Sequence, residues 1–193
     1  MCARYEQNSP PGRLIERFGL AVLPEFNFPD GEIRPTDRAV AVLPGGRAVA
    51  LPWGLPAPWD GKPLINARAE TLEEKPTFRP LLEQRCLVPA TAYFEWRKAG
   101  SAKLKNRIAR RDGEIFAFAG LTDGERFTII TCVPGRDVEA IHSRMPVILA
   151  PERESDWIAP GRHFADCRDL LEPVRPGTLA SVEDQPVQRD LFG

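Results

Sequence analysis

The sequence contains no apolar stretch long enough to cross a membrane. A membrane-spanning helix needs about 20 consecutive apolar residues, whereas the longest apolar runs here, such as Ala39–Leu43 and Ile115–Ala119, have the length of a single strand. The first residues also lack the apolar core of a secretory signal. We therefore expect a cytoplasmic protein with no membrane partner.

Residues that form disulfides or bind metals are scarce. The chain has four cysteines and two histidines, which are Cys2, Cys86, Cys132, Cys167, His142 and His163. Closely spaced thiolate or imidazole ligands are typical of zinc sites, and no Cys-x-x-Cys pair is present. The sequence therefore predicts no metal site, no cofactor and no disulfide framework. We expect the three internal cysteines to be buried as small apolar side chains.

An excess of one charge is also absent. The formal net charge is -1, from 26 Lys and Arg against 27 Asp and Glu, so total charge does not indicate a nucleic-acid partner. The charges are nevertheless segregated. Arg97–Arg111 holds seven cations and no carboxylate, whereas acidic residues crowd Glu152–Asp156 and Glu183–Asp190. The basic run is consistent with either a solvated hairpin or a surface for an anionic ligand.

Long helices are disfavoured by the 20 prolines and 15 glycines, which are spread through the chain of 193 residues. That length suits one domain, which we assign to residues 1–193. Ala39–Leu43 and Ala48–Leu51 flank a Pro-Gly-Gly-Arg turn and predict a hairpin. Asp-Gly turns predict a three-stranded antiparallel meander, formed by Lys105–Arg110, Glu114–Leu121 and Arg126–Cys132.

Helices are expected to be short and peripheral. A first helix is predicted at Pro10–Phe18, with one apolar face and with Arg13 and Arg17 facing water. Four further short helices are predicted at Leu72–Glu74, Phe78–Gln84, Val138–Ile141 and Glu152–Ile158. The predicted fold class is therefore α+β: a β-rich single domain with an antiparallel, barrel-like sheet and short peripheral helices.

Cys2 is the residue with the most distinctive chemistry. Initiator methionine is normally removed before a small second residue, which would leave an N-terminal cysteine whose α-amine lies beside its thiol. The amine, with a pKa of about 7.7 to 8.0, and the thiol, near 8.5, are both partly nucleophilic at neutral pH. With an aldehyde the amine forms an imine and the sulfur closes on it, which gives a thiazolidine. A chance cysteine after the start codon is the structural alternative.

Three polar residues interrupt apolar sequence, namely Asn66, Glu95 and His142. Each has a structural explanation. Asn66 suits a turn, Glu95 suits the surface face of a strand, and His142 suits the end of a helix. If Glu95 instead faces a semi-apolar pocket, its pKa would rise and it could transfer protons, with His142 as a second acid-base group. Spacing alone leaves both explanations open.

Eight short motifs occur in a fixed order within residues 1–150. They are Met1–Tyr5, Ile33–Thr36, Trp53–Leu55, Ile65–Thr71, Arg85–Pro89, Tyr93–Trp96, Phe116–Leu121 and Ile141–Pro146. This ordered set, with a cysteine at position 2, resembles the SOS response-associated peptidase (SRAP) family, also described as abasic-site processing proteins. The resemblance implies a SRAP-like fold and a protein that senses abasic sites in single-stranded DNA, attaches to them covalently and shields them.

The resemblance also implies roles for individual residues. Cys2 would form the cross-link, and Asn66 would orient its amine and the lesion. Glu95 would move protons at the amine and the adduct, and His142 would assist opening of the sugar ring. Five residues would lie against the DNA: Arg4, Pro35, Trp53, Arg68 and Arg144. Of these, Arg4 and Arg68 would hold phosphates, and Pro35 and Trp53 would press against bases. We expect a monomer that associates with the nucleoid when bound to DNA.

The peptidase in the family name refers to removal of whatever precedes the cysteine, which here is only Met1. The resemblance implies that this step can be autocatalytic, although a host methionine aminopeptidase would give the same product. The chemistry on abasic DNA would pass through a Schiff base, as in lyase reactions.

Three features depart from the family pattern. Ala3 stands where the family usually has glycine, and the segment Trp59–Lys62 is shorter than in many relatives. After Gly161 the usual family ending is absent, and Leu179–Val182 occupies the place of the closing strand. The C-terminal part, residues 151–193, therefore matches the family less well than residues 1–150.

Two other classes of function are consistent with parts of the sequence. An N-terminal-nucleophile amidohydrolase or amidotransferase would also use a cysteine exposed by loss of Met1, although the glycine-rich opening of those enzymes is absent. A non-covalent single-stranded DNA module would use the basic hairpin and leave Cys2 without a role. A covalent product with abasic DNA would distinguish the function implied by the family resemblance from both alternatives.

Overall fold

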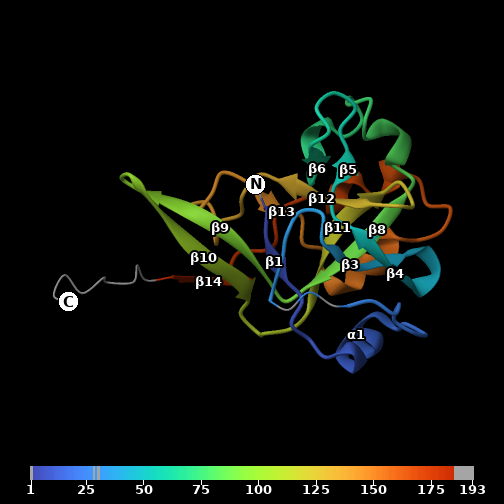
Figure 1. Ribbon diagram of the computed structural model, residues 1–193, viewed down its shortest axis with the longest axis horizontal. Coiled ribbons are helices and arrows are strands. Elements are labelled where there is room, and N and C mark those ends of the chain that lie inside the picture. Colours follow the sequence, from blue (N-terminus) through green and yellow to red (C-terminus); the bar gives the residue numbers. More distant parts are fainter. Residues whose placement is uncertain (1, 28, 30, 185–193) are drawn as a thin grey trace.

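The computed structural model describes residues 2–27, 29 and 31–184. Most of its regular structure is β-strand (Figure 1). The strands are β1 (Tyr5–Glu6), β2 (Glu32–Ile33), β3 (Arg38–Leu43), β4 (Arg47–Pro52), β5 (Leu55–Pro56), β6 (Pro63–Leu64), β7 (Asn66–Arg68), β8 (Arg85–Ala90), β9 (Ala92–Ala99), β10 (Ala102–Arg110), β11 (Phe116–Thr122), β12 (Phe127–Cys132), β13 (Met145–Pro146) and β14 (Leu179–Glu183). The α-helices are α1 (Pro11–Phe18) and α2 (Glu154–Trp157). No helix within the described ranges is long and apolar enough to cross a membrane.

The first helix confirms the prediction for Pro10–Phe18. α1 has proline in its first turn, where the missing N–H removes no helical hydrogen bond. It ends at Gly19, whose φ of 59° and backbone N–H bond to Glu16 form a left-handed cap. Leu14 is the residue of α1 that is fully buried, so the helix lies on the domain along one narrow face.

One antiparallel sheet has the strand order β14-β10-β9-β1-β2. In its β9–β10 hairpin Glu95 lies opposite Asn106, and Asn106 in turn lies opposite Glu183 of β14. Figure 1 shows the hairpin projecting from the rest of the domain with β14 along its edge. The first four residues of β9 are buried and the others are at least partly exposed. The inner half of this hairpin therefore belongs to the core and the outer half reaches into solvent.

The second sheet has the strand order β13-β12-β11-β8-β3-β4, and β7 adds to β12 in parallel. β8, β11 and β12 are buried along their whole length, as expected for strands that are covered on both faces. Gly120 allows β8 and β11 to approach closely, because a Cβ there would lie 2.8 Å from the sulfur of Cys86. β5 and β6 form a separate two-stranded sheet.

Aromatic side chains join the two sheets. Tyr5 of β1 and Tyr93 of β9 meet Phe118 of β11 edge to face, with ring centroids 5.6 and 6.1 Å apart. Trp53 packs against Tyr5 with centroids 5.2 Å apart. The N-terminal segment is therefore fixed at the junction of the sheets, and Cys2 lies three residues before Tyr5.

Several predicted elements are confirmed. The predicted hairpin at residues 39–51 is β3–β4, and Leu179–Val182 lies in β14. The β-rich α+β class with antiparallel sheets is also confirmed. The barrel-like closure is not, because within the described residues both sheets remain open, with different strands at their two edges.

The predicted meander is wrong in its first strand. β11 and β12 pair as predicted, but β10 belongs to the other sheet and pairs with β9 and β14. The reason is burial: β11 is buried on both faces and suits a central position, whereas much of β10 is partly or fully exposed. The turn at Gly113 therefore begins a crossing between sheets instead of a hairpin.

The additional helices are mostly wrong. Leu72–Glu74 and Val138–Ile141 form turns, and Phe78–Gln84 contains only the 3-10 turn Arg79–Leu81. Glu152–Ile158 contains a 3-10 turn followed by α2. Segments this short cannot offset the cost of helix nucleation without strong tertiary support.

Candidate functional site

Cys2 is fully buried at the start of the chain described by the structure, just before β1. Its thiol lies 3.6 Å from the carbonyl oxygen of Arg4, to which it can donate a hydrogen bond. Burial raises the pKa of the Cys2 thiol, and the negative charge of Glu95 raises it further. The sulfur is therefore held as a neutral thiol beside a carboxylate that can accept its proton.

Asn66 holds the backbone of Cys2. It is the first residue of β7, and its side-chain amide donates a hydrogen bond of 2.7 Å to the Cys2 carbonyl oxygen. Its own carbonyl oxygen, Oδ1, is buried and accepts no hydrogen bond from any described residue. Asn66 thus fixes the cysteine and keeps an acceptor in the same pocket.

Glu95 lies in the buried half of β9 and is only 2% exposed. The reading of Glu95 as a surface carboxylate is therefore wrong. Burial raises the pKa of its carboxyl group, while His142, when protonated, acts in the opposite direction. A carboxyl with a raised pKa can hold and release a proton closer to neutral pH.

His142 faces Glu95 from the loop that precedes β13. Its Nε2 lies 3.8 Å from Oε2 of Glu95. Its Nδ1 lies 3.1 Å from both the backbone nitrogen and the carbonyl oxygen of Arg144. The Arg144 N–H can donate to a neutral ring, and a protonated ring can donate to the Arg144 carbonyl. The backbone therefore accommodates both charge states of the imidazole.

The Arg144 side chain is committed to the protein. Its guanidinium binds both carboxylate oxygens of Glu70 at 2.5 and 2.9 Å and donates to the Thr131 carbonyl at 2.6 Å. Only 14% of the side chain is exposed. The predicted contact of Arg144 with DNA is untested, but its observed role is to hold the loop that carries His142. Sequence analysis missed Glu70, although it belongs to the same motif as Asn66.

Arg4 and Arg68 remain available to an anionic ligand. Arg4 pairs with Glu32 at 3.0 Å but keeps 38% of its side chain exposed, and its guanidinium carbon lies 5.6 Å from the ring centre of Trp96. Arg68, at the end of β7, is exposed, and no hydrogen bond or ion pair from the described residues holds it. Sequence analysis also missed Trp96, the half-buried neighbour of Glu95.

The structure does not support the predicted stacking of Trp53 on a base. Trp53 is fully buried, donates to the Ile65 carbonyl at 2.9 Å and stacks on Phe127 in the core. Pro35 is half-buried in a turn at residues 34–37, where Thr36 has a φ of 77°. That conformation is strained for a β-branched residue. Two backbone hydrogen bonds to Trp53 hold the turn in place: the Thr36 N–H donates to the Trp53 carbonyl, and the Trp53 N–H donates to the Asp37 carbonyl.

The basic run at residues 97–111 is not an open cationic surface. Four of its side chains have carboxylate partners, in the pairs Arg97–Glu183, Lys105–Glu32, Arg107–Glu6 and Arg110–Asp112. One of these partners, Glu183, comes from the acidic segment near the C-terminus. The solvated hairpin therefore describes this run better than a dedicated anion site.

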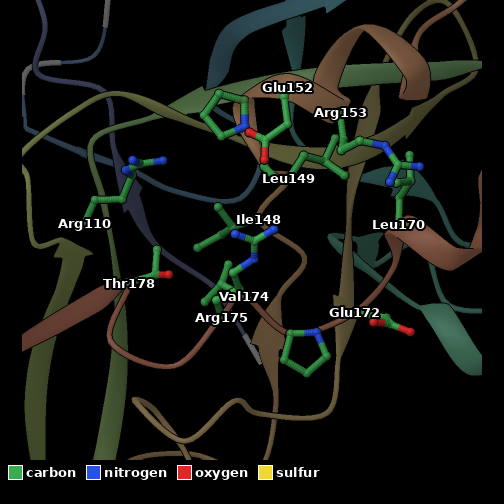
Figure 2. A pocket seen from close by; sticks show the side chains of 13 residues that line it. Arg110, Ile148, Leu149, Glu152, Arg153, Leu170, Glu172, Val174, Arg175 and Thr178 are labelled. Atoms are coloured by element: carbon green, nitrogen blue, oxygen red, sulfur yellow. The ribbon is translucent and has the colours of Figure 1, made fainter.

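A cavity of about 450 Å³ lies away from the predicted site residues (Figure 2). It is lined in part by Arg110, Arg153 and Arg175, with Glu152 and Glu172 among the other lining residues. Arg110 and Arg153 are already paired with aspartates. Within the described part of the chain no cluster of His, Cys, Asp and Glu could hold a metal. All four cysteines are buried and free.

The four predicted reactive residues therefore come together from four distant parts of the chain. Asn66 contacts Cys2, Glu95 perturbs its thiol, and His142 faces Glu95. β1, β7, β9 and the loop before β13 position them. The helix-end and turn explanations for His142 and Asn66 do not account for this convergence.

Comparison with known proteins identifies the family. The family model for SOS response associated peptidase (SRAP) matches residues 1–191. Abasic site processing protein YoqW of Bacillus subtilis (strain 168) is 38% identical over an alignment of 195 positions, gaps included. The alignment covers 90% of this chain and 87% of that protein. Abasic site processing protein YedK of Escherichia coli (strain K12) is 38% identical over 116 residues, covering 55% of this chain and 52% of its own.

A solved structure shares the fold. The crystal structure of a Bacteroides thetaiotaomicron protein superposes with a TM-score of 0.81 at 27% sequence identity, covering 95% of this chain and 92% of that one. The chain therefore belongs to the SOS response associated peptidase (SRAP) family.

Proposed function

We propose that this protein recognises abasic sites in single-stranded DNA and forms a covalent cross-link to them through Cys2 after Met1 is removed. The observation that carries the proposal is the meeting of the buried Cys2 and Glu95 with the half-buried Asn66 and His142. The names of the relatives, abasic site processing proteins, agree with this function.

The cross-link follows from the chemistry of a 1,2-aminothiol. The ring-opened abasic sugar carries an aldehyde at C1. The Cys2 amine adds to that carbon, and loss of one water gives an imine. The Cys2 sulfur then adds to the same carbon while its proton moves to the former imine nitrogen through an acid-base group. The product is a thiazolidine, with one water released overall and no change in oxidation state.

The neighbouring residues supply orientation and proton transfer. Asn66 fixes the Cys2 carbonyl, and its open Oδ1 can accept a hydrogen bond from the new amine. Glu95 takes a proton from the amine and returns it to the hydroxyl that leaves as water; it then takes the thiol proton and passes it to the former imine nitrogen. Its raised pKa lets it act as base and acid in turn. His142 protonates the ring oxygen of the sugar as the ring opens, and the Arg144 backbone stabilises the imidazole before and after this step.

The DNA strand would lie over Arg4, Arg68 and Pro35. Arg4 and Arg68 would contact phosphates, and Pro35 would press against a base beside the lesion from its rigid turn. Trp96, whose ring centre lies 5.6 Å from the Arg4 guanidinium carbon, offers a further aromatic ring to a base. Arg144 and Trp53 would act indirectly, through the His142 loop and the core, respectively.

Removal of Met1 by the protein itself is part of the proposal. Glu95 would assist attack on the peptide bond between Met1 and Cys2, since its charge acts on the Cys2 thiol. Intact mass spectrometry of the purified Glu95→Gln variant tests this step. Retained Met1 would support self-cleavage, whereas complete loss of Met1 would assign removal to a host aminopeptidase.

The decisive experiment is a denaturing gel with single-stranded DNA that contains one abasic site. Protein lacking Met1 should give a shifted band with the true abasic site and none with a reduced, aldehyde-free analogue. Cys2→Ser should abolish the stable adduct and leave most reversible DNA binding intact. An undiminished adduct in Cys2→Ser would exclude Cys2 as the linking residue.

The amidohydrolase alternative is not favoured by the fold. Those enzymes have helical layers on both sides of two sheets, whereas the described residues contain only the two α-helices α1 and α2, of 8 and 4 residues.

A further inference from the structure

Asn106 is a buried polar residue that the proposed reaction does not use. It lies in β10 with 3% of its surface exposed, and its direct partner on β9 is Glu95. Directly opposite residues of an antiparallel pair point to the same face of the sheet, with Cβ atoms about 4.5–5.5 Å apart. Their chain neighbours point to the other face, where the Lys105 ammonium lies 4.2 Å from the ring centre of Phe94. The Asn106 amide and the Glu95 carboxyl are therefore neighbours on one face.

Hydrogen bonds fix the orientation of the Asn106 amide. Its Nδ2 donates to Oε2 of Glu183 on β14 and to the Leu104 carbonyl oxygen, both at 3.1 Å. An amide nitrogen has two hydrogens, so both are used, and the polar atom that remains is the carbonyl oxygen Oδ1. β10 lies between β9 and β14, so a nitrogen that turns toward β14 leaves Oδ1 on the side of β9 and Glu95.

Glu183 is itself held in place. Nε and a terminal nitrogen of Arg97 each donate to one of its carboxylate oxygens at 2.8 Å. Arg97 and Glu183 belong to the two strands that flank β10, and Figure 1 shows β14 along the edge of the β9–β10 hairpin. A carboxylate only accepts hydrogen bonds, so a reversed amide would set the Asn106 oxygen against the Glu183 oxygens. The ion pair therefore keeps the amide in one orientation.

We propose that Asn106 is a positioning residue for Glu95: with its nitrogen held by Glu183, it offers its carbonyl oxygen to the protonated Glu95 carboxyl and accepts a hydrogen bond from it. A carboxylate has no hydrogen to donate, so this contact favours the protonated form. The catalytic consequence rests on the proposed function. Asn106 would keep the proton on Glu95 until that proton is passed to the leaving hydroxyl or to the former imine nitrogen.

Other groups around Glu95 also influence its charge. They are the His142 imidazole from the loop before β13, the Cys2 thiol and amine from the segment before β1, and the Tyr93 hydroxyl from β9 itself. All of them stay in place when Asn106 is replaced. A change in the Glu95 titration that follows such a replacement therefore reports on the amide.

NMR titration of labelled glutamate carboxyl groups, in protein without Met1 and without DNA, tests the contact. Glu95→Gln identifies the Glu95 signal, and Glu154 in the same spectrum is the internal control. Asn106→Leu keeps the size of the side chain but removes the acceptor. The pKa of Glu95 should fall by about 0.5 to 1, which is the effect of one ordinary hydrogen bond, and the pKa of Glu154 should not change. An unchanged or raised pKa of Glu95 would overturn the proposal.

A matched pair of variants tests the orientation of the amide. Arg97→Leu keeps the Glu183 carboxylate that holds Asn106, so the pKa of Glu95 should not fall. Arg97→Leu combined with Glu183→Leu removes both charges together and frees the amide to turn an N–H toward Glu95. That N–H favours the carboxylate, so the pKa of Glu95 should fall. A fall in the single variant, or no fall in the double variant, would contradict the role of Glu183.

The pH dependence of cross-linking separates this contact from the proposed function. In Asn106→Leu the lower rise of the pH-rate profile should move to lower pH together with the Glu95 titration. A titration that moves while the profile stays would support the contact and exclude Glu95 as the base of the reaction. Absence of any cross-link would overturn the proposed function alone, because the titration needs no DNA.

Discussion

Two glutamates are buried among the residues that the structure describes, and their surroundings differ. Glu154, which is 5% exposed, binds both guanidinium nitrogens of Arg17 at 2.9 and 2.7 Å and fastens α1 to α2. Glu95, which is 2% exposed, faces the imidazole of His142 at 3.8 Å and lies near the Cys2 thiol. Burial raises the pKa of both carboxyl groups.

The difference lies in the partner. A guanidinium is always charged and fixes the Glu154 carboxylate in a two-pronged ion pair. An imidazole can be neutral or protonated, so the charge beside Glu95 is not fixed as it is beside Glu154. A raised pKa therefore does not identify a reactive carboxyl by itself. The difference in partners is what makes Glu95, and not Glu154, the candidate acid-base group.

Replacing the reactive carboxyl should have the largest effect on chemistry. Glu95→Gln keeps the size of the side chain but cannot accept a proton, so cross-linking should slow by about 10² to 10⁴-fold, the usual contribution of an acid-base group. The melting temperature should change little. The rate is measured by single-turnover cross-linking of protein from which Met1 has been removed. Glu154→Gln is the matched control. An equal loss of rate in both variants would remove the distinction between the two glutamates.

Removing Arg17, the ion-pair partner of Glu154, should have the largest effect on stability. Arg17→Ala leaves Glu154 buried without its counter-ion, which costs about 3 to 5 kcal/mol for a buried pair. Denaturant unfolding measures the loss. The remaining folded protein should cross-link at the normal rate. A cost near zero would mean that Glu154 reaches water or another cation once Arg17 is gone.

The pH dependence of cross-linking should reveal the raised pKa of Glu95. As a base, Glu95 is active when ionised, so the rate should rise with pH as the solution passes through a pKa above the usual 4.5. A second rise should follow near pH 8 as the Cys2 amine loses its proton. The lower rise should disappear in Glu95→Gln and persist in Glu154→Gln. A lower rise that is unchanged in Glu95→Gln would assign it to another group.

The smallest predicted effect concerns Glu70. It holds Arg144, whose backbone contacts His142, so Glu70→Gln should loosen the imidazole and slow cross-linking about tenfold. This is less than the roughly 100-fold that a 1 Å misplacement of a reacting group can cost. A pH-rate profile distinguishes this role from direct proton transfer, because its shape should stay that of the unchanged protein. A lost inflection would instead make Glu70 an acid-base group.

Local patterns predicted much of the fold. The helix α1 and the β3–β4 and β11–β12 hairpins follow from apolar periodicity and turn residues close in sequence. Whether β10 pairs with β9 or with β11 depends on which strand is covered on both faces, and that is a property of the whole packed domain. The expectation that Arg17 faces water failed for the same reason, because its partner, Glu154, lies 137 residues away.

The four candidate reactive residues were predicted from motif order and chemical type, and their convergence required the structure. The sequence could not indicate that Trp53 is in the core, since a tryptophan in a short motif suits either a surface wedge or a packed interior. Glu70 was missed because its importance depends on Arg144, which is 74 residues away. Residues that act through others leave little signal in a single sequence.

The burial of Cys2 also bears on how long the protein survives in an oxidising cell. Sulfur is oxidised most readily as an exposed thiolate, and the folded domain keeps this one covered and protonated. The groups that surround it come from positions 66, 95 and 142. A chain still emerging from the ribosome has not yet acquired them, so we expect the Cys2 sulfur to be more open to peroxide before folding is complete than afterwards.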